Sequence, residues 1–145
     1  MRRVVLLVAL AGCRTPGSPA PPLRDLPPLF DGRSLHGWVG RPDLWSGETV
    51  DGEGEIVGRV AGPMAHNEFL VSPTVLDDFR LVVEVKLSSE GNNSGIQFRS
   101  ARIAYEDGHD GVRGYQADVG GPDDAYWGRL YHERGRGWLW QDGLP

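Results

Sequence analysis

Hydrophobic and polar residues alternate along much of the chain after residue 29. Residues 78–88 show the clearest case, with apolar side chains at every second position from Phe79 to Leu87. The positions between them are mostly polar: Arg80, Val82, Glu84 and Lys86. Since successive side chains of a strand point to opposite faces, this spacing predicts a β-strand with one apolar and one polar face.

Three more stretches are predicted to be strands, namely residues 68–72, 94–100 and 114–121. The last two each set apolar residues against polar ones, and their polar positions are Gln97, Arg99, Gln116 and Asp118. Gly, Pro, Asn and Asp separate the stretches, and no window keeps a helical period. The sequence therefore predicts an all-β domain whose antiparallel sheets cover a core on one side only.

The polar faces of these predicted strands share a composition of carboxylates, amides and guanidinium groups. The residues are Glu84, Gln97, Arg99, Gln116 and Asp118. Such a set fits a polar groove across neighbouring strands, and it also fits the solvated side of a sandwich. Both interpretations remain open at this point.

The composition agrees with one loop-rich globular domain. The chain has 145 residues, of which 39% are hydrophobic and 24% charged, with 21 Gly and 11 Pro. Twenty acidic and 15 basic residues give a formal net charge of -5. No basic run is interleaved with aromatic residues, so nucleic acid is excluded as an expected partner.

The N-terminus resembles a bacterial lipoprotein signal peptide. A basic start is followed by an apolar run over residues 4–10 and by the lipobox Leu10-Ala11-Gly12-Cys13. The run is too short to span a membrane as a helix. We expect residues 1–13 to be the leader, with cleavage before Cys13 and a lipid on that cysteine, although an ordinary secretory leader is the alternative.

Residues 14–28 are predicted to be a Pro-rich tether, because their composition cannot pack a core. The mature protein is then expected in the cell envelope, held to a membrane by the lipid on Cys13, in the periplasm or on the outer-membrane face. The chain has one cysteine, so no internal disulfide is expected.

Five motifs from residue 29 onward resemble the 3-keto-disaccharide hydrolase domain family. In chain order they are "LFDGRSLHGW", "NEFLVS" with "DFRLVVEVKL", "NSGIQFRS", "GYQADVGG" and "WGRLYHERGRG". The resemblance implies a concanavalin A-like jelly-roll β-sandwich over residues 29–145, with sugars bound on a concave sheet. The family domain continues beyond the "LYHE" motif, so the resemblance implies a domain that is incomplete at its C-terminus.

The resemblance also implies a reaction. A ketone at C3 of a sugar acidifies the proton at C2, so that a base removes it, the aglycone leaves C1, and water adds. On the matched positions the expected catalytic residues are Glu84, Arg99 and Asp118. The expected substrate-binding residues are Gln97, Gln116, Tyr115, His132, Glu133 and Trp127.

One motif departs from the family pattern. Many relatives have Glu and Gln where this chain has Gln116 and Asp118, so the carboxylate has moved two residues, about 6.6 Å, along the same face. The identity of the base is therefore open between Glu84 and Asp118. A purely structural ion pair between Glu84 and Arg99 is a competing interpretation.

A divalent ion is a possible cofactor, because carboxylate and amide oxygens suit Ca²⁺, Mg²⁺ or Mn²⁺ and such an ion stabilises an enolate. The four histidines are scattered and show no metal-ligand spacing. The alternatives to an enzyme are a surface-anchored carbohydrate-binding module without turnover and a non-catalytic fragment of a longer enzyme.

Overall fold

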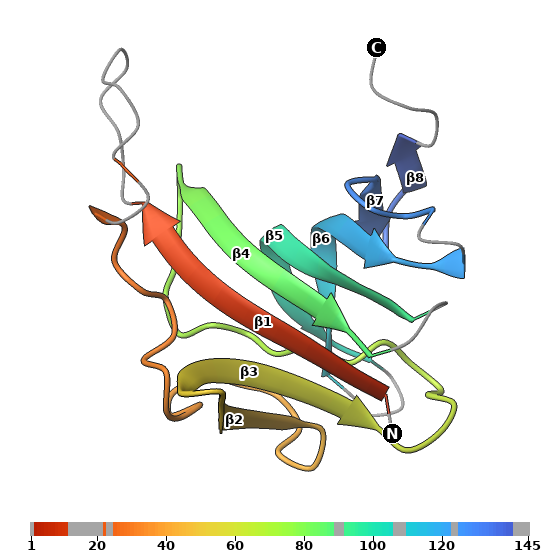
Figure 1. Cartoon of the computed structure of the whole chain (residues 1–145). Coiled ribbons are helices and arrows are strands. Elements are labelled where there is room, and N and C mark those ends of the chain that lie inside the picture. The colour runs from red at the N-terminus through yellow and green to blue at the C-terminus, as the bar shows by residue number, and fades with distance from the viewer. Residues whose placement is uncertain are drawn as a thin grey trace. The chain divides into compact units, whose positions relative to one another are not determined.

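The computed structural model describes residues 2–11, 22, 25–88, 92–105, 110–122 and 125–140, with only the backbone for residues 2–11 and 140 (Figure 1). Cys13 and most of the predicted tether lie outside the described residues. Two compact units divide the chain. The first unit contains Met1–Pro63 and Leu70–Lys86, and the second contains Met64–Phe69 and Leu87–Pro145.

The first unit is built on one four-stranded sheet in the order β2-β3-β1-β4. Its strands are β1 (Arg2–Ala11), β2 (Trp45–Val50), β3 (Glu53–Val60) and β4 (Arg80–Leu87). Both β2 and β1 pair antiparallel with β3. Residues 2–11 of the predicted leader thus form an inner strand of this sheet, while cleavage before Cys13 stays a prediction.

The second unit contains the other four-stranded sheet, in the simple order β5-β6-β7-β8. Its strands are β5 (Asn93–Ala104), β6 (Asp110–Gly120), β7 (Leu130–Glu133) and β8 (Gly137–Trp140). Each strand pairs antiparallel with the next. The predicted all-β, antiparallel fold class is therefore confirmed, whereas the jelly-roll connectivity stays a prediction.

A tight hairpin joins β2 to β3. Asp51 and Gly52 have φ values of 52° and 88°, as the favoured two-residue hairpin turns require. Ile56 and Val57 on β3 are both fully buried, although they point to opposite faces. The Trp45 ring packs on the backbone of Gly58, where a Cβ would lie 2.6 Å from it. The core of the first unit is therefore centred on β3.

One predicted strand is wrong. Residues 68–72 form no strand, and Val71 makes only an isolated antiparallel bridge to Val39, with backbone hydrogen bonds of 2.9 and 2.8 Å. Pro73 follows at once and cannot donate a ladder hydrogen bond. By contrast, β4 lies within the predicted residues 78–88, and its Arg80, Glu84 and Lys86 are exposed as the alternation requires.

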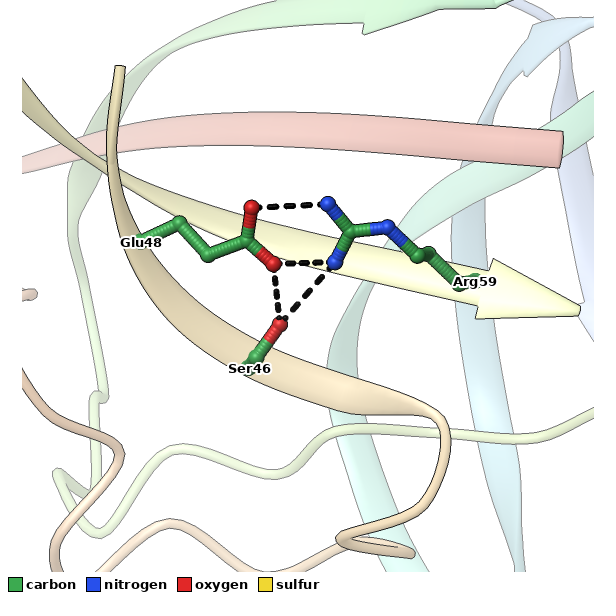
Figure 2. A network of polar contacts seen from close by, with 3 residues as sticks. All are labelled: Ser46, Glu48 and Arg59. Carbon is green, nitrogen blue, oxygen red and sulfur yellow. Dashed lines mark hydrogen bonds and ion pairs between the residues drawn. The ribbon is translucent and has the colours of Figure 1, made fainter. Parts of the chain in front are cut away.

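A polar cluster of Ser46, Glu48 and Arg59 joins β2 to β3, and we call it the Glu48 cluster (Figure 2). The Arg59 guanidinium donates to both carboxylate oxygens of Glu48, at 2.7 Å to Oε2. Ser46 Oγ donates to Glu48 Oε1 at 2.7 Å and accepts from Arg59 at 3.3 Å. The hydrogen bond to Glu48 raises the pKa of Arg59 further, so both charges are kept.

Candidate functional site

The strand register of the second unit places four polar or aromatic side chains in one row. Gln97 lies opposite Gln116, Gln116 opposite Tyr131, and Tyr131 opposite Trp138, so the row crosses all four strands. Because side chains alternate along β6, Asp118 lies on the same face as Gln116. The side-by-side placement of Gln116 and Asp118, expected from their spacing, is what the structure shows.

Hydrogen bonds connect this face into a chain that we call the Asp118 network, made of Asn93, Gln97, Ser100, Gln116 and Asp118. Ser100 Oγ donates to Gln97 Oε1 at 2.9 Å, and Gln97 Nε2 donates to Gln116 Oε1 at 3.0 Å. Gln116 Nε2 then donates to Asp118 Oδ1 at 3.0 Å. Each step points its donor toward the carboxylate.

The Asp118 carboxylate is buried, with 3% of its surface exposed. Oδ1 also accepts from Asn93 Nδ2 at 3.5 Å, whereas Oδ2 has no hydrogen-bond partner among the described residues. Burial raises the pKa of Asp118; the hydrogen bonds from Gln116 and Asn93 oppose this, and the charge of Glu133 adds to it. The network thus contains a carboxyl group that binds a proton more readily than usual.

A glycine makes room for this arrangement. Gly95 lies opposite Asp118 on β5, and a Cβ there would lie 2.5 Å from the Gln116 side chain. That distance is far below any normal contact between carbon atoms. Gly95 therefore allows the Gln116 amide to lie across β5 and reach Asp118.

Arg99 lies where the alternation of β5 breaks. The register shifts between Phe98 and Ala101, and Arg99 has a φ of 47°. A bulge of this kind redirects a side chain and is common beside functional sites. Arg99 is exposed, and the bulge interrupts the strict alternation from which Gln97 and Arg99 were expected on one face, so their shared face stays a prediction.

The other predicted substrate-binding residues lie in two places. Tyr115 and His132 are register partners on the opposite face of the sheet, with ring centroids 4.7 Å apart. Glu133 is buried and accepts from Asn67 Nδ2 at 3.2 Å, while Arg134 Nε lies 3.9 Å from its other oxygen. The structure therefore separates Tyr115 and His132 from the Asp118 network.

Two predicted site residues are exposed and make no hydrogen bond of the network. Trp127 is 48% exposed, in the turn between β6 and β7. Glu84 is exposed on β4 in the first unit, so the second unit assembles its polar network without it. The catalytic role of Glu84 stays a prediction.

Sequence reasoning missed the residues that complete this face. Asn93 had a signal, because it continues the period-two spacing from Gln97 through Gly95. Arg129 and Tyr131 had none that could be read locally, because their positions depend on how β7 pairs with β6. Asp118 N–H donates to the Arg129 carbonyl at 2.9 Å, which fixes that pairing.

No three His, Cys, Asp or Glu side chains gather into a metal-binding group among the residues that the structure describes. Within the same ranges no helix is long and apolar enough to cross a membrane. A divalent ion and a lipid anchor both stay predictions.

Comparison with known protein families gives a match to residues 25–142, described as a 3-keto-alpha-glucoside-1,2-lyase-like domain. The chain belongs to this family. The 3-keto-alpha-glucoside-1,2-lyase-like match includes the whole Asp118 network, and membership supports a carbohydrate-related function. No curated protein and no solved structure matches the chain significantly.

Proposed function

We propose that the protein is an exported enzyme that cleaves the glycosidic bond of 3-keto-glycosides, with Asp118 as the base. The observation that carries this proposal is the Asp118 carboxylate itself. One oxygen is held by two side-chain amides while the other has no described partner, and burial raises the pKa of the group. A base of raised pKa is matched to proton removal near neutral pH.

In the proposed reaction Asp118 Oδ2 takes the proton from C2 of the keto sugar. The electron pair left at C2 forms an enolate with the C3 carbonyl. It then forms the C1–C2 double bond as the C1–O bond breaks, and the aglycone oxygen takes the proton that Asp118 holds and leaves as an alcohol. Water adds to C1 and a proton returns to C2, so the sum is hydrolysis.

The amides supply the positioning. Gln97 and Gln116 are fixed by their mutual hydrogen bond, and each side chain has further donor or acceptor capacity for sugar hydroxyls. Oδ2 is covered in this structure. We therefore propose that sugar binding displaces the side chains that cover it.

A second candidate function is a carbohydrate-binding module without turnover. Trp127 favours it, because an exposed indole ring stacks well on the apolar face of a sugar. Such a module uses Gln97 and Gln116 in the same way but has no need of a base.

The test is a release assay with the full chain on 3-keto-trehalose and a 3-keto-glucoside, with and without Mn²⁺, Mg²⁺ or Ca²⁺. We expect turnover that falls by about 10²–10⁴-fold in Asp118→Asn, the usual contribution of a general base. Asp110→Asn is the matched control, because Asp110 is exposed and pairs only with Arg102 among the described residues.

The outcomes separate the candidates. Equal loss in both variants, or full activity in a folded Asp118→Asn protein, contradicts the role of Asp118. Sugar binding by a folded wild-type chain that shows no turnover under any of the ion conditions favours the binding module instead.

A further inference from the structure

Arg129 is the residue at which the backbone of the turn meets β6. It directly precedes β7, and its carbonyl accepts the N–H of Asp118 at 2.9 Å. The β6–β7 ladder ends at Ala117 and Leu130; beyond it the Asp118 carbonyl accepts from Gly128 N–H at 3.0 Å, so Asp118 and Arg129 are backbone neighbours at the end of the ladder. The Arg129 guanidinium lies over Trp138, which belongs to the row of Gln116 and Tyr131, so its side chain is on the face of the Asp118 network.

Aromatic rings hold the Arg129 guanidinium. Its central carbon lies 5.6 Å from the ring centroid of Tyr126 and 6.0 Å from that of Trp138. The two rings are themselves in contact, with centroids 5.0 Å apart, and Tyr131 packs edge-on against Trp138 at the same distance. Three rings from the turn, β7 and β8 therefore fix the position of one cation.

Arg129 forms no ion pair with any described residue of the second unit. Arg102 is paired with Asp110 at 2.8 Å, and Arg134 lies near Glu133, but no described residue accepts a hydrogen bond from the Arg129 guanidinium. A guanidinium has five N–H donors in its plane, and rings on its faces leave that edge available. The Arg129 side chain is half-buried, so its guanidinium is partly desolvated. An acceptor that binds there replaces water and is attracted more strongly than at a fully exposed cation.

We propose that Arg129 binds the oxygen at C3 of the sugar and stabilises it as the enolate forms, because the fold holds an arginine without a described acceptor beside Asp118. This inference rests on the proposed function and deepens it. This inference has Arg129 hold the enolate oxygen, whereas the family resemblance implies Arg99, in the bulge of β5, as the catalytic arginine. A planar keto oxygen matches the guanidinium edge, so Arg129 also selects keto sugars over the parent sugars.

The test separates enolate formation from bond cleavage. The probe is a 3-keto-1,5-anhydro sugar, which has a C2 proton but no leaving group, and the reading is exchange of that proton in D₂O, beside release from a 3-keto-glucoside. We expect Arg129→Met to lose about 10²-fold or more in both rates, the usual effect of removing one oxyanion donor. Arg113→Met, on the exposed part of β6, is the control and keeps both rates.

A second variant covers the case in which Arg129→Met does not fold. Arg129→Lys keeps a cation over the rings but loses the planar edge, so we expect a folded protein that still loses at least about tenfold in exchange. Wild-type rates in Arg129→Lys, or rates within about threefold of wild type in a folded Arg129→Met, overturn the inference and leave the proposed function standing.

If the folded wild-type chain neither exchanges the C2 proton nor releases the aglycone, the proposed function fails. The inference about Arg129 is then tested by calorimetric measurement of sugar binding alone. Preference for the 3-keto sugar over its parent in wild type, lost in the Arg129 variant that folds, supports the recognition role. Equal binding of both sugars, or binding of neither, overturns it.

Discussion

The Glu48 cluster and the Asp118 network each contain one carboxylate on a pair of neighbouring strands, yet they differ in how its charge is met. Both oxygens of Glu48 accept from Arg59, and Ser46 adds a third hydrogen bond (Figure 2). Among the described residues the Asp118 carboxylate accepts hydrogen bonds only from neutral amides, and one of its oxygens accepts none. A satisfied ion pair holds strands together, whereas an unsatisfied buried carboxylate costs stability, and such groups cluster at functional sites.

Among variants that leave Asp118 and Arg129 in place, the largest effect is expected from breaking the bridge between the amides and the carboxylate. Gln116→Met keeps the size of the side chain but removes its hydrogen bonds to Gln97 and Asp118. A hydrogen bond to a charged group is worth roughly 1.5–3 kcal/mol, so we expect release activity to fall about 10- to 100-fold. Ser46→Ala in the Glu48 cluster is the control and leaves activity unchanged; equal activity in the two variants argues against a catalytic network.

A smaller effect is expected when the space for Gln116 is filled. Gly95→Ala places a methyl group 2.5 Å from the Gln116 side chain, and overpacking of this kind costs about 1–3 kcal/mol of unfolding free energy. Chemical denaturation measures the change. Gly62→Ala is the matched control, because nothing lies within 4 Å of its added Cβ. Equal stability of the two variants means that the Gln116 side chain moves aside without cost.

The smallest effect is the pH dependence of stability. The folded-state pKa of Asp118 is raised by burial, so the native chain holds this proton to a higher pH than the unfolded chain does. The contribution of Asp118 to stability is then complete below its unfolded pKa of about 3.9 and is lost as pH rises through the folded value. We expect the Tm of Asp118→Asn to gain on that of wild type as pH rises; a constant difference contradicts the raised pKa.

Period-two spacing predicted the parts of the structure that depend on one strand at a time. It gave the faces of β4 and β6 and the placement of Gln116 beside Asp118. The β2–β3 hairpin had a local signal as well, since Asp51-Gly52 is a favoured turn dipeptide. Neither β2 nor β3 is among the strands that the spacing predicted.

The rest of the site depends on pairing between strands, which local spacing does not contain. The bulge that contains Arg99 comes from the register shift between β5 and β6. The place of Arg129 beside Asp118 comes from the return of the chain through the turn into β7. A one-residue change in either register moves these side chains to the other face of the sheet.

The position of β1 bears on whether the predicted cleavage of the leader comes before or after folding. Its residues lie between β3 and β4, and they are the same residues that a signal peptidase is expected to remove. If folding comes before cleavage, a cut before Cys13 detaches a strand that is already hydrogen-bonded. The loss of β1 then exposes the edges of both β3 and β4. If residues 1–13 are cleaved as predicted, they must stay unpaired until the peptidase has acted.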